Sequence, residues 1–506
     1  MAPWIISLII ISIYCIAVIL IGIASRDKGV STLENYYVGG RSIGPFVSYF
    51  TYVATFHSSF AFLGAAGQIY TNGINFFAVF TSCVVSPLMI YFIGRPVWYL
   101  GKKYNFMTQA DLLSSYYESN VLRMIISVVS LIFLVPYLQS QIMGGGIIFE
   151  TVTGGRVPYW AGTLIIYIVM ISYILLGGFK AVAWTDTMQG LMMIFLVWIG
   201  GGVVLGKVTG TLDWSVLMNR VAQEVPEKLI IPVEYWPTYM TTFMSLFGIS
   251  IYPPSFIRFY SVKNPKTLKW LAVTSPIYLI FFYVPIFLIA FSGILVMPGL
   301  ERADMVLPAM LSSYAPPVLT GLIMAGALAA TMSTADSQLH VTSSIFTIDI
   351  YKPFINKDAT EERALFVGKI AIVVVSAIAL LMSQFTNALL VAIVAVALGG
   401  CLQILPSLLG ALYWKGITKE GAITGIIVGV VVLCITQFVI ASPLGLHSGV
   451  WGLIFNVLSC IIVSRFTEAP SNEKVEMFHG YIREINEEQD RAKYGSVLPQ
   501  TAGTNL

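Results

Sequence analysis

The stretch that decides how this chain is interpreted is AATMSTADSQL, Ala329 to Leu339. It continues the apolar run PPVLTGLIMAGAL and leads into HVTSSIFTIDIY, so by length and hydrophobicity it belongs to a membrane-spanning helix. Yet it carries a dense group of polar residues: Ser333, Thr334, Asp336, Ser337 and Gln338. Polar groups are costly in hydrocarbon, so we expect each of them to meet a partner.

The whole chain has the composition of an integral membrane protein. Of its 506 residues, 57% are hydrophobic and 10% are charged. Apolar runs of about 20 residues recur along it and predict an all-α protein with about thirteen transmembrane helices. The first run is too long for a signal-peptide core and lacks a basic start, so it is kept as a helix. The expected spans are residues 4–24, 45–69, 75–100, 121–147, 158–177, 186–206, 237–259, 270–297, 316–345, 365–385, 389–413, 419–440 and 447–466.

The predicted domain organisation is simple. Residues 1–466 form one transmembrane domain, and the polar residues 467–506 form a cytoplasmic tail with a short surface helix followed by disorder. The net charge of +3 is small and dispersed, which argues against nucleic-acid binding. The five cysteines all lie in apolar runs without metal-ligand spacing and are interpreted as small core residues. Membrane lipid is the expected surrounding, and the sequence indicates no obligate protein partner.

The orientation follows from the placement of Lys and Arg. With these spans, 23 of the 28 Lys and Arg residues fall on one side of the membrane. That excess marks the cytoplasmic side. We therefore expect a multi-pass plasma-membrane protein with its N-terminus outside and its C-terminus in the cytoplasm.

Two of the expected spans are poor helices. The second contains YFTYVATFHSSFAFLGAAG, with His57 in its polar middle, and the seventh contains FMSLFGISIYPPSF, interrupted by Gly248, Pro253 and Pro254. In a bilayer, such breaks survive only where protein or a water-filled cavity satisfies the freed backbone groups. Because the breaks are five spans apart, they predict two inverted repeats, spans 2–6 and 7–11, with spans 1, 12 and 13 peripheral.

The polar stretch and the first break together suggest a cation site. Ala330, Ser333 and Thr334 have the spacing i, i+3, i+4 and share one helix face. Their oxygen atoms, with the carbonyls of Ala54 and His57, form a neutral set that suits Na⁺, the only metal ion we expect; the lack of an acidic cluster argues against Ca²⁺. Ser and Thr in membrane helices also bond to their own or a neighbouring helix, and spacing alone favours that alternative. The coincidence with two broken spans shifts the balance to a site.

Several motifs, in their order along the chain, resemble those of the sodium:solute symporter family, which includes proline, pantothenate, glucose and monocarboxylate carriers. They are NYYVGGRSIGPF (Asn35–Phe46), GGFKAVAWTDTMQG (Gly177–Gly190), IRFYSVKN, AATMSTADSQL and FTIDIYK. The resemblance implies a LeuT-type inverted-repeat fold and secondary active transport coupled to Na⁺. It assigns the sodium ligands to the same five residues and Asp186 to the cytoplasmic sodium exit path. The alternative for Asp186 is a carboxylate at a helix N-terminus near the membrane surface.

The substrate pocket is expected between the broken spans and their neighbours. The candidate residues are Phe56, Ser58, Phe60, Tyr137, Gln139, Gln141, Ser245, Ile249, Tyr252 and Gln403. Each could equally be a helix-packing residue. Sodium/proline carriers have Asp at the position of Phe56, so here the ammonium group of a zwitterion has no obvious counter-ion, and we expect no Lys or Arg in the pocket spans either. We therefore expect a Na⁺-coupled importer of a small organic acid, first a monocarboxylate; pantothenate, an amino acid such as proline, or a sugar are the alternatives.

Other classes of protein are less consistent with the sequence. A membrane enzyme would need a nucleophile and base or a metal motif, and HExxH and paired intramembrane carboxylates do not occur. A solute sensor would need an output domain, for which the tail is too short. The imidazole of His57 is expected to pack or to contact substrate rather than to couple protons, and Asp336 to be structural or solvent-facing.

Overall fold

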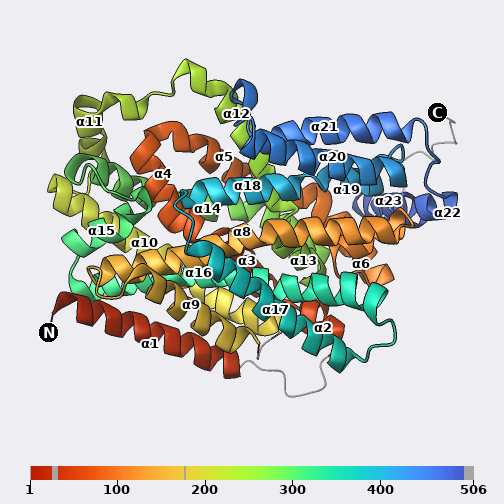
Figure 1. Cartoon of the computed structure of the whole chain (residues 1–506), viewed down its shortest axis with the longest axis horizontal. Coiled ribbons are helices and arrows are strands. Elements are labelled where there is room, and N and C mark those ends of the chain that lie inside the picture. The colour runs from red at the N-terminus through yellow and green to blue at the C-terminus, as the bar shows by residue number, and fades with distance from the viewer. Residues whose placement is uncertain (1, 25–31, 176–177, 495–506) are drawn as a thin grey trace.

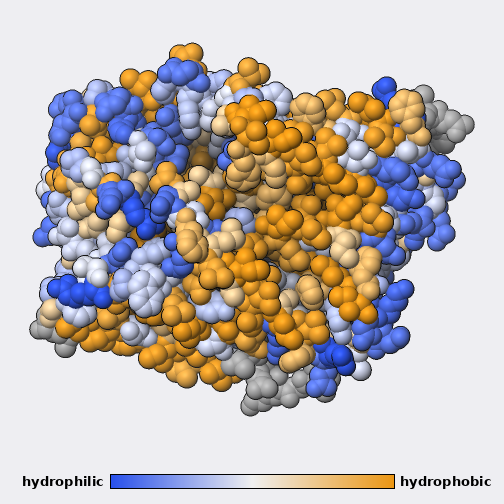
Figure 2. Space-filling view, in the orientation of Figure 1, coloured by the Kyte–Doolittle hydropathy of each residue, from blue (hydrophilic) through white to orange (hydrophobic). Residues whose placement is uncertain are grey.

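The structure is a computed structural model that describes residues 2–24, 32–175 and 178–494. Within these ranges the regular structure is helical, apart from an isolated β-bridge between Ile43 and Val262. The longest helices run along the long axis of the molecule (Figure 1). Figure 2 shows hydrophobic side chains gathered across the middle of this face and hydrophilic ones towards its left and right ends. This distribution is typical of a protein that crosses a bilayer.

Nine helical segments of the described ranges are long and apolar enough to cross a membrane. They are α1 (Pro3–Ala24), the run Phe60–Tyr104 with α4 (Ala65–Asn72), α5 (Phe77–Val85) and α6 (Arg95–Tyr104), α8 (Asn120–Val152), α10 (Phe179–Thr209), α14 (Pro265–Val296), α16 (Pro317–Ser344) with its π-helical extension to Ile355, α17 (Glu361–Ser383), the pair α18 (Leu390–Leu402) and α19 (Leu405–Leu412), and α20 (Lys419–Phe438).

The remaining helices are shorter. Two of them are apolar, α9 (Tyr159–Ile174) and α21 (Ser448–Ser464). The others are α2 (Leu33–Val38), α3 (Pro45–Phe56), α7 (Gln109–Tyr116), α11 (Trp214–Glu224), α12 (Trp236–Ser245), α13 (Pro253–Ser261), α15 (Val306–Tyr314), α22 (Asn472–Val475) and α23 (Tyr481–Tyr494).

Local sequence explains where many of these helices begin. The hydroxyls of Thr108, Ser119 and Thr418 accept hydrogen bonds from backbone N–H groups in the first turns of α7, α8 and α20. Pro265 and Pro317 are the first residues of α14 and α16, where the missing N–H has no helical partner to lose. These signals hold the ends of helices whose middles are stabilised by packing.

Helix α16 is the central element of the fold. It packs against α1, α3, α8, α10 and α17, and every residue from Ile323 to Ser344 is buried. The polar stretch that opened the sequence analysis is therefore surrounded by protein on all sides and not by lipid. Its partners come from segments far away in the chain.

The two expected breaks coincide with interruptions of helical structure. Helix α3 ends at Phe56, and His57 is extended before the chain resumes helical turns. Helix α12 passes into a 3-10 turn, Leu246–Ser250, and α13 starts only at Pro253, after the non-helical residues Ile251 and Tyr252. The buried environment of both interruptions supplies protein groups to their free backbone atoms.

The polar tail packs on the rest of the chain. Phe478 is fully buried, and its ring lies against those of Tyr104, Phe106 and Tyr116. The expected surface helix is present as α22 and α23, anchored by this contact. The expected disorder at the end of the tail concerns residues 495–506, which lie outside the described residues.

Candidate cation and solute site

The interruption after α3 frees main-chain carbonyl groups. His57 follows Phe56 with φ −93° and ψ 103°, and the next regular segment is the π-helical turn Phe60–Gly64. Carbonyl groups in the last turn of a helix have no donor within that helix. The carbonyls at the end of α3 are therefore available to a neighbouring helix or to a cation.

Hydroxyl groups of α16 meet these carbonyls. Ser333 Oγ lies 3.0 Å from the carbonyl oxygen of Ala54 and 3.1 Å from that of Ala330. Thr334 Oγ1 lies 3.3 Å from the carbonyl oxygen of His57. The structure thus brings together the five residues predicted to bind sodium, and all five are fully buried. Their role as ligands stays a prediction.

The chemistry of this cluster suits a hard monovalent cation. All of its oxygen atoms are neutral, and a hydroxyl can rotate so that its lone pairs face a cation. No group of three or more His, Cys, Asp or Glu side chains that could hold a metal ion occurs in the described ranges. Sequence reasoning missed Thr55, whose carbonyl accepts from Thr334 Oγ1 at 3.2 Å. Its place between Ala54 and His57, at the break itself, was the available signal.

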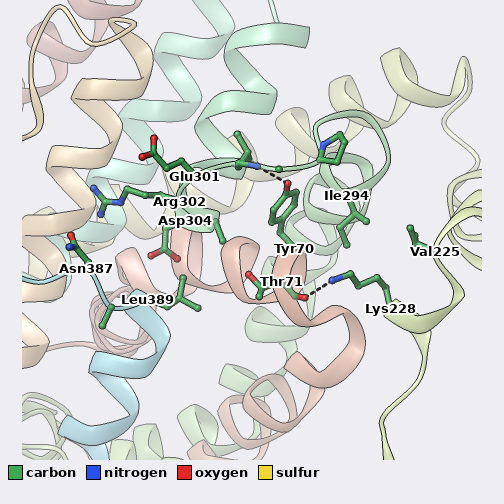
Figure 3. A pocket seen from close by; sticks show the side chains of 15 residues that line it. Tyr70, Thr71, Val225, Lys228, Ile294, Glu301, Arg302, Asp304, Asn387 and Leu389 are labelled. Carbon is green, nitrogen blue, oxygen red and sulfur yellow. Dashed lines mark hydrogen bonds between the residues drawn. The ribbon is translucent and has the colours of Figure 1, made fainter.

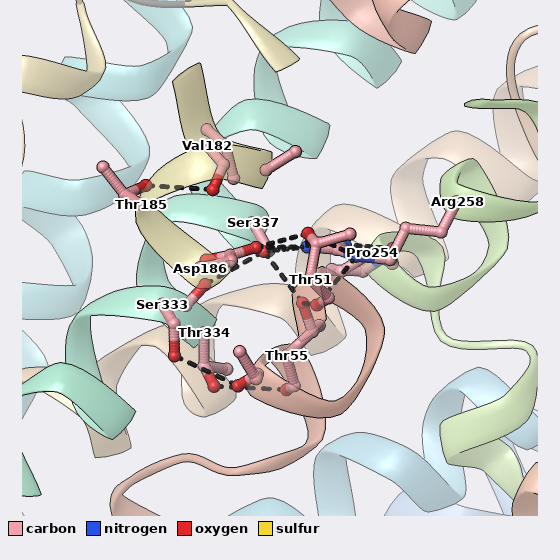
Figure 4. A network of polar contacts seen from close by, with 12 residues as sticks. Thr51, Thr55, Val182, Thr185, Asp186, Pro254, Arg258, Ser333, Thr334 and Ser337 are labelled. Carbon is pink, nitrogen blue, oxygen red and sulfur yellow. Dashed lines mark hydrogen bonds and ion pairs between the residues drawn. The ribbon is translucent and has the colours of Figure 1, made fainter. Parts of the chain in front are cut away.

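A buried ion pair between Asp186 and Arg258 lies beside this cluster (Figure 4). It is at the level of Thr51, one helical turn before the end of α3. Asp186 Oδ2 accepts hydrogen bonds from Arg258 Nη2 at 3.0 Å and from Thr51 Oγ1 at 2.5 Å. Arg258 Nη2 also donates to Ser337 Oγ at 2.6 Å. Because these residues come from α3, α10, α13 and α16, the pair ties the two interrupted segments to both neighbouring helices.

This pair corrects two sequence expectations. Helix α10 begins at Phe179, so Asp186 lies about two turns inside it and is fully buried, rather than standing at a helix N-terminus near the surface. The expectation that the pocket spans carry no Lys or Arg is wrong for Arg258, whose side chain is 2% exposed. Its position inside the seventh expected span was visible in the sequence. It had been counted among the 23 Lys and Arg residues on the cytoplasmic side, and not as a residue of the pocket spans.

Several of the predicted pocket residues meet between the two interruptions. Ser58 Oγ lies 3.4 Å from the hydroxyl of Tyr137. The rings of Tyr137 and Tyr252 are 5.1 Å apart, so this contact reaches from the first interruption to the second. Gln141 supports the first one, because its Oε1 accepts from the backbone N–H of Ser59 at 3.0 Å.

The other predicted pocket residues have packing contacts. Phe56 lies on the ring of Tyr52, and Phe60 and Ile249 are buried. Gln403 donates to the carbonyls of Gly399 and Gly449, and Ser245 lies close to the same two glycines, where α12, α18 and α21 meet. Gln139 donates to Thr386 Oγ1 at 2.6 Å. Within the described ranges, no hydrogen bond joins Ser245, Gln139 or Gln403 to Ser58, Tyr137 or Tyr252.

His57 and Asp336 both have structural contacts. The imidazole of His57 packs among Tyr278 and Phe282, and its Nδ1 lies 2.6 Å from the carbonyl oxygen of Val53. These are packing contacts, one of the two roles expected for this imidazole, and its Nε2 is buried without a partner in the described part of the chain. Asp336 is fully buried and accepts a hydrogen bond from the hydroxyl of Tyr173, so a solvent-facing position is excluded.

A cavity of about 610 Å³ opens near the far end of α4, at the loop that precedes α15 (Figure 3). Asp304 lies at this cavity, and its Oδ2 accepts from the backbone N–H of Leu390 at 3.2 Å. Burial raises the pKa of Asp304 to about 6, against the opposing effects of this hydrogen bond and of the nearby Arg302. The cavity does not include Ser58, Tyr137 or Tyr252 among its lining residues.

Comparison with known proteins agrees with this geometry. The chain is 19% identical to a Na⁺-coupled sialic acid symporter solved in a substrate-bound outward-open state, with a TM-score of 0.78 over 92% of this chain and 99% of that one. It is 14% identical to a nucleobase-cation-symport-1 family transporter solved in a closed conformation with bromovinylhydantoin bound, with a TM-score of 0.54 over 87% of this chain and 97% of that one. The chain therefore has the fold of cation-coupled membrane symporters.

The sequence comparisons give the family. The profile described as "Sodium:solute symporter family" matches residues 36–429, and the chain belongs to that family. Its relatives include the high-affinity proline transporter PutP of Bacillus subtilis (29% identical over 90% of this chain and 97% of the relative) and a sodium/proline symporter of Staphylococcus aureus (26% identical, 91% and 93%). The resemblance inferred from the motifs is confirmed. Sodium is the coupling ion, and the chain is a multi-pass membrane transporter and not an enzyme.

Proposed function

We propose that this protein imports a small carboxylate-bearing solute together with Na⁺ by alternating access, and that the oxygen cluster of α3 and α16 is the sodium site. The contacts of Ser333 and Thr334 with carbonyls of α3 are the observation that carries this proposal. A cation at this point would link the first interruption to α16. Coupling then follows if sodium and solute both bind one conformation better than the other.

The proposed architecture has thirteen spans. The nine long segments, the two shorter apolar helices α9 and α21, the interrupted segment α12–α13, and the division of the run 45–104 into two spans account for this number. Spans 2–6 and 7–11 form the inverted repeats, with residues 1–466 as one transporter domain and 467–506 as a cytoplasmic tail. The N-terminus lies outside the cell membrane and the C-terminus inside.

The solute is proposed from two considerations that partly disagree. Pocket composition favoured a monocarboxylate, because no acidic side chain replaces the Asp that proline carriers have at Phe56. The relatives named above transport proline. We therefore place proline first and a monocarboxylate second, followed by pantothenate and sugars. A carboxylate common to the first three solutes would be held by the bound Na⁺ and by backbone N–H groups at the interruptions.

Asp186 is proposed to lie on the sodium exit path. Its carboxylate is one contact away from Ser337, which lies in the same helix as the proposed ligands and accepts from the same Arg258. Sodium leaving the cluster on this side would meet that carboxylate. The passage requires the Asp186–Arg258 pair to separate, which connects ion release to movement of α13.

The test is uptake into proteoliposomes that contain the purified protein. An inward Na⁺ gradient should concentrate labelled L-proline, and an equal K⁺ or choline gradient should not. Unlabelled proline, lactate, pantothenate and glucose are added as competitors to rank the solutes. Uptake that is independent of Na⁺ would contradict the coupling. Na⁺-driven uptake of labelled lactate or pantothenate, with no uptake of labelled proline, would restore the organic-acid choice.

A further inference from the structure

A cavity of about 210 Å³ lies between the beginning of α6, the loop that follows α19 and the tail helix α23. Helices α6 and α23 both lie towards the right end of the molecule in Figure 1, where the surface in Figure 2 changes from hydrophobic to hydrophilic. The cavity is lined by Arg95, the first residue of α6, and by no Asp or Glu. Its formal charge is therefore positive.

Arg95 has no acidic partner. Its side chain is half-buried, and no ion pair among the residues that the structure describes includes it. Its Nη2 donates to Oε1 of Gln489 in α23, and Nε2 of Gln489 donates to the hydroxyl of Tyr99 at 2.8 Å. A guanidinium group has several N–H donors, and a neutral amide occupies one of them without balancing the charge. Arg95 can therefore still bind an anion.

The cavity lies where lipid-facing surface meets the polar end of the molecule. Tyr91 and Phe92, which line it, are 47% and 56% exposed and belong to the run Phe60–Tyr104 that is apolar enough to span a membrane. Tyr413 lines the opposite side and is also exposed, and aromatic residues of this kind are enriched at the membrane–water interface. Helix α6 ends in two lysines, and the proposed orientation puts this side in the cytoplasm. This is the depth of phospholipid headgroups.

The chemistry of the lining favours the phosphate of an anionic phospholipid. A guanidinium group binds phosphate through parallel hydrogen bonds, and a basic pocket at the cytoplasmic membrane surface is typical of lipid headgroup sites. The exposed rings of Tyr91 and Phe92 offer apolar surface that acyl chains would cover and a soluble phosphate ion would not. Because no carboxylate lines the cavity, the ammonium group of a zwitterionic lipid would have no counter-ion beside Arg95. Headgroup hydroxyls can bond to Tyr99 and Asn486.

We propose that this cavity binds the headgroup of an anionic phospholipid, with its phosphate on Arg95 and its acyl chains along Tyr91 and Phe92. The site is separate from the proposed sodium and solute sites and does not rest on the proposed function. A lipid bound here contacts α6, Tyr413 and α23 at once. It therefore stabilises the packing of the tail helix on the membrane domain.

The experiment is a lipid titration of the purified full chain in detergent, followed by thermal unfolding. Phosphatidylglycerol and phosphatidylcholine with identical acyl chains are compared, and phosphatidylglycerol should raise the melting temperature more, in a saturable way. Arg95→Gln should weaken the apparent affinity for phosphatidylglycerol by about 5- to 50-fold, because it removes the cation that faces the phosphate. Arg465→Gln is the matched control, since Arg465 is exposed at the end of α21 and does not line the cavity. Its titration should equal that of wild type.

A second variant blocks the cavity and keeps its charge. Asn486→Trp places a large side chain at an exposed position of the lining, so the fold should tolerate it. It should abolish the preference for phosphatidylglycerol although Arg95 is still present. If Arg95→Gln does not fold, Asn486→Trp decides.

Each outcome supports or overturns the inference. A preference for phosphatidylglycerol that is lost in Arg95→Gln and Asn486→Trp but kept in Arg465→Gln supports it. Equal shifts with both lipids would show that the headgroup charge is not recognised, and a preference that persists in both test variants would place the lipid elsewhere. Inorganic phosphate is titrated as a third ligand; if it reproduces the shift, the site takes a soluble anion and the lipid assignment fails. Na⁺-driven uptake is measured separately, so the proposed function stands or fails independently.

Discussion

The two interruptions of this transporter are built differently. At the first, Ser59 donates its N–H to Gln141 and its hydroxyl to the carbonyl of Ser140, and the hydroxyls of α16 reach the end of α3. At the second, Gln109 donates to the carbonyl of Ile251, and Ser250 donates its hydroxyl to the carbonyl of Ser86. The first interruption is thus held by the protein in a shape that suits a cation. The second is held to its neighbours by side chains that reach main-chain carbonyls.

The largest expected effect concerns the ion pair that holds both interrupted segments. Asp186→Asn leaves Arg258 as a buried cation without a full counter-charge, and we expect a loss of about 3–5 kcal/mol of stability. Thermal unfolding of the purified protein measures it. The double variant Asp186→Asn with Arg258→Met should recover part of the loss, because it removes the uncompensated charge. Equal melting of wild type and Asp186→Asn would show that the pair does not hold the two segments.

Removing a hydroxyl at the first interruption should weaken sodium binding. Ser333→Ala and Thr334→Ala should each raise the Na⁺ concentration for half-maximal uptake by about 10- to 100-fold, because each removes an oxygen that faces a charge. Thr342→Ala is the control, since Thr342 is buried in the same helix and bonds to its own backbone at Gln338. Unchanged sodium activation in both test variants would remove the site.

Acidity should affect the packing of α4 against the loop that precedes α15. Asp304 lies against Gly67 of α4, and burial raises its pKa to about 6. The folded protein therefore binds this proton more tightly than the unfolded chain, so stability falls by about 2–3 kcal/mol as pH rises from about 4 to about 6. Melting temperatures across this range should show the fall, and Asp304→Asn should abolish it. Asp213→Asn, at an exposed helix cap, should leave it intact.

The smallest expected effect is a difference in stability between two variants, each of which removes one hydroxyl from one of the two interruptions. Tyr252→Phe removes a hydroxyl that lies beside the amide of Gln338 and is bonded to no main-chain group in the described part of the chain, so stability should change by less than about 0.5 kcal/mol. Ser59→Ala removes a hydroxyl that is bonded to the main chain and should cost about 1 kcal/mol. Denaturation of both variants under identical conditions measures the difference. A larger loss for Tyr252→Phe would mean that the second interruption is held as firmly as the first.

Much of this molecule follows from patterns along the chain. Apolar runs placed the membrane helices to within a few residues in most cases, because a span needs about 20 apolar residues whatever its neighbours are. The i, i+3, i+4 spacing of Ala330, Ser333 and Thr334 put three oxygen-bearing residues on one face. Such periodicity is a property of a single helix. It needs no knowledge of the partner.

In contrast, only the folded structure shows which side chains contact each other. The sequence places Arg258 inside the seventh expected span but does not give its partner, because the pairing with Asp186 arises only when α13 and α10, 72 positions apart in the chain, approach each other. Asp336 was visible within the opening stretch, yet only the folded structure shows that it accepts a hydrogen bond from Tyr173. The sequence alone determined the membrane class, the family and the oxygen-rich face of one helix. The tertiary structure decided which groups that face meets, because long-range contacts depend on how helices pack and not on local spacing.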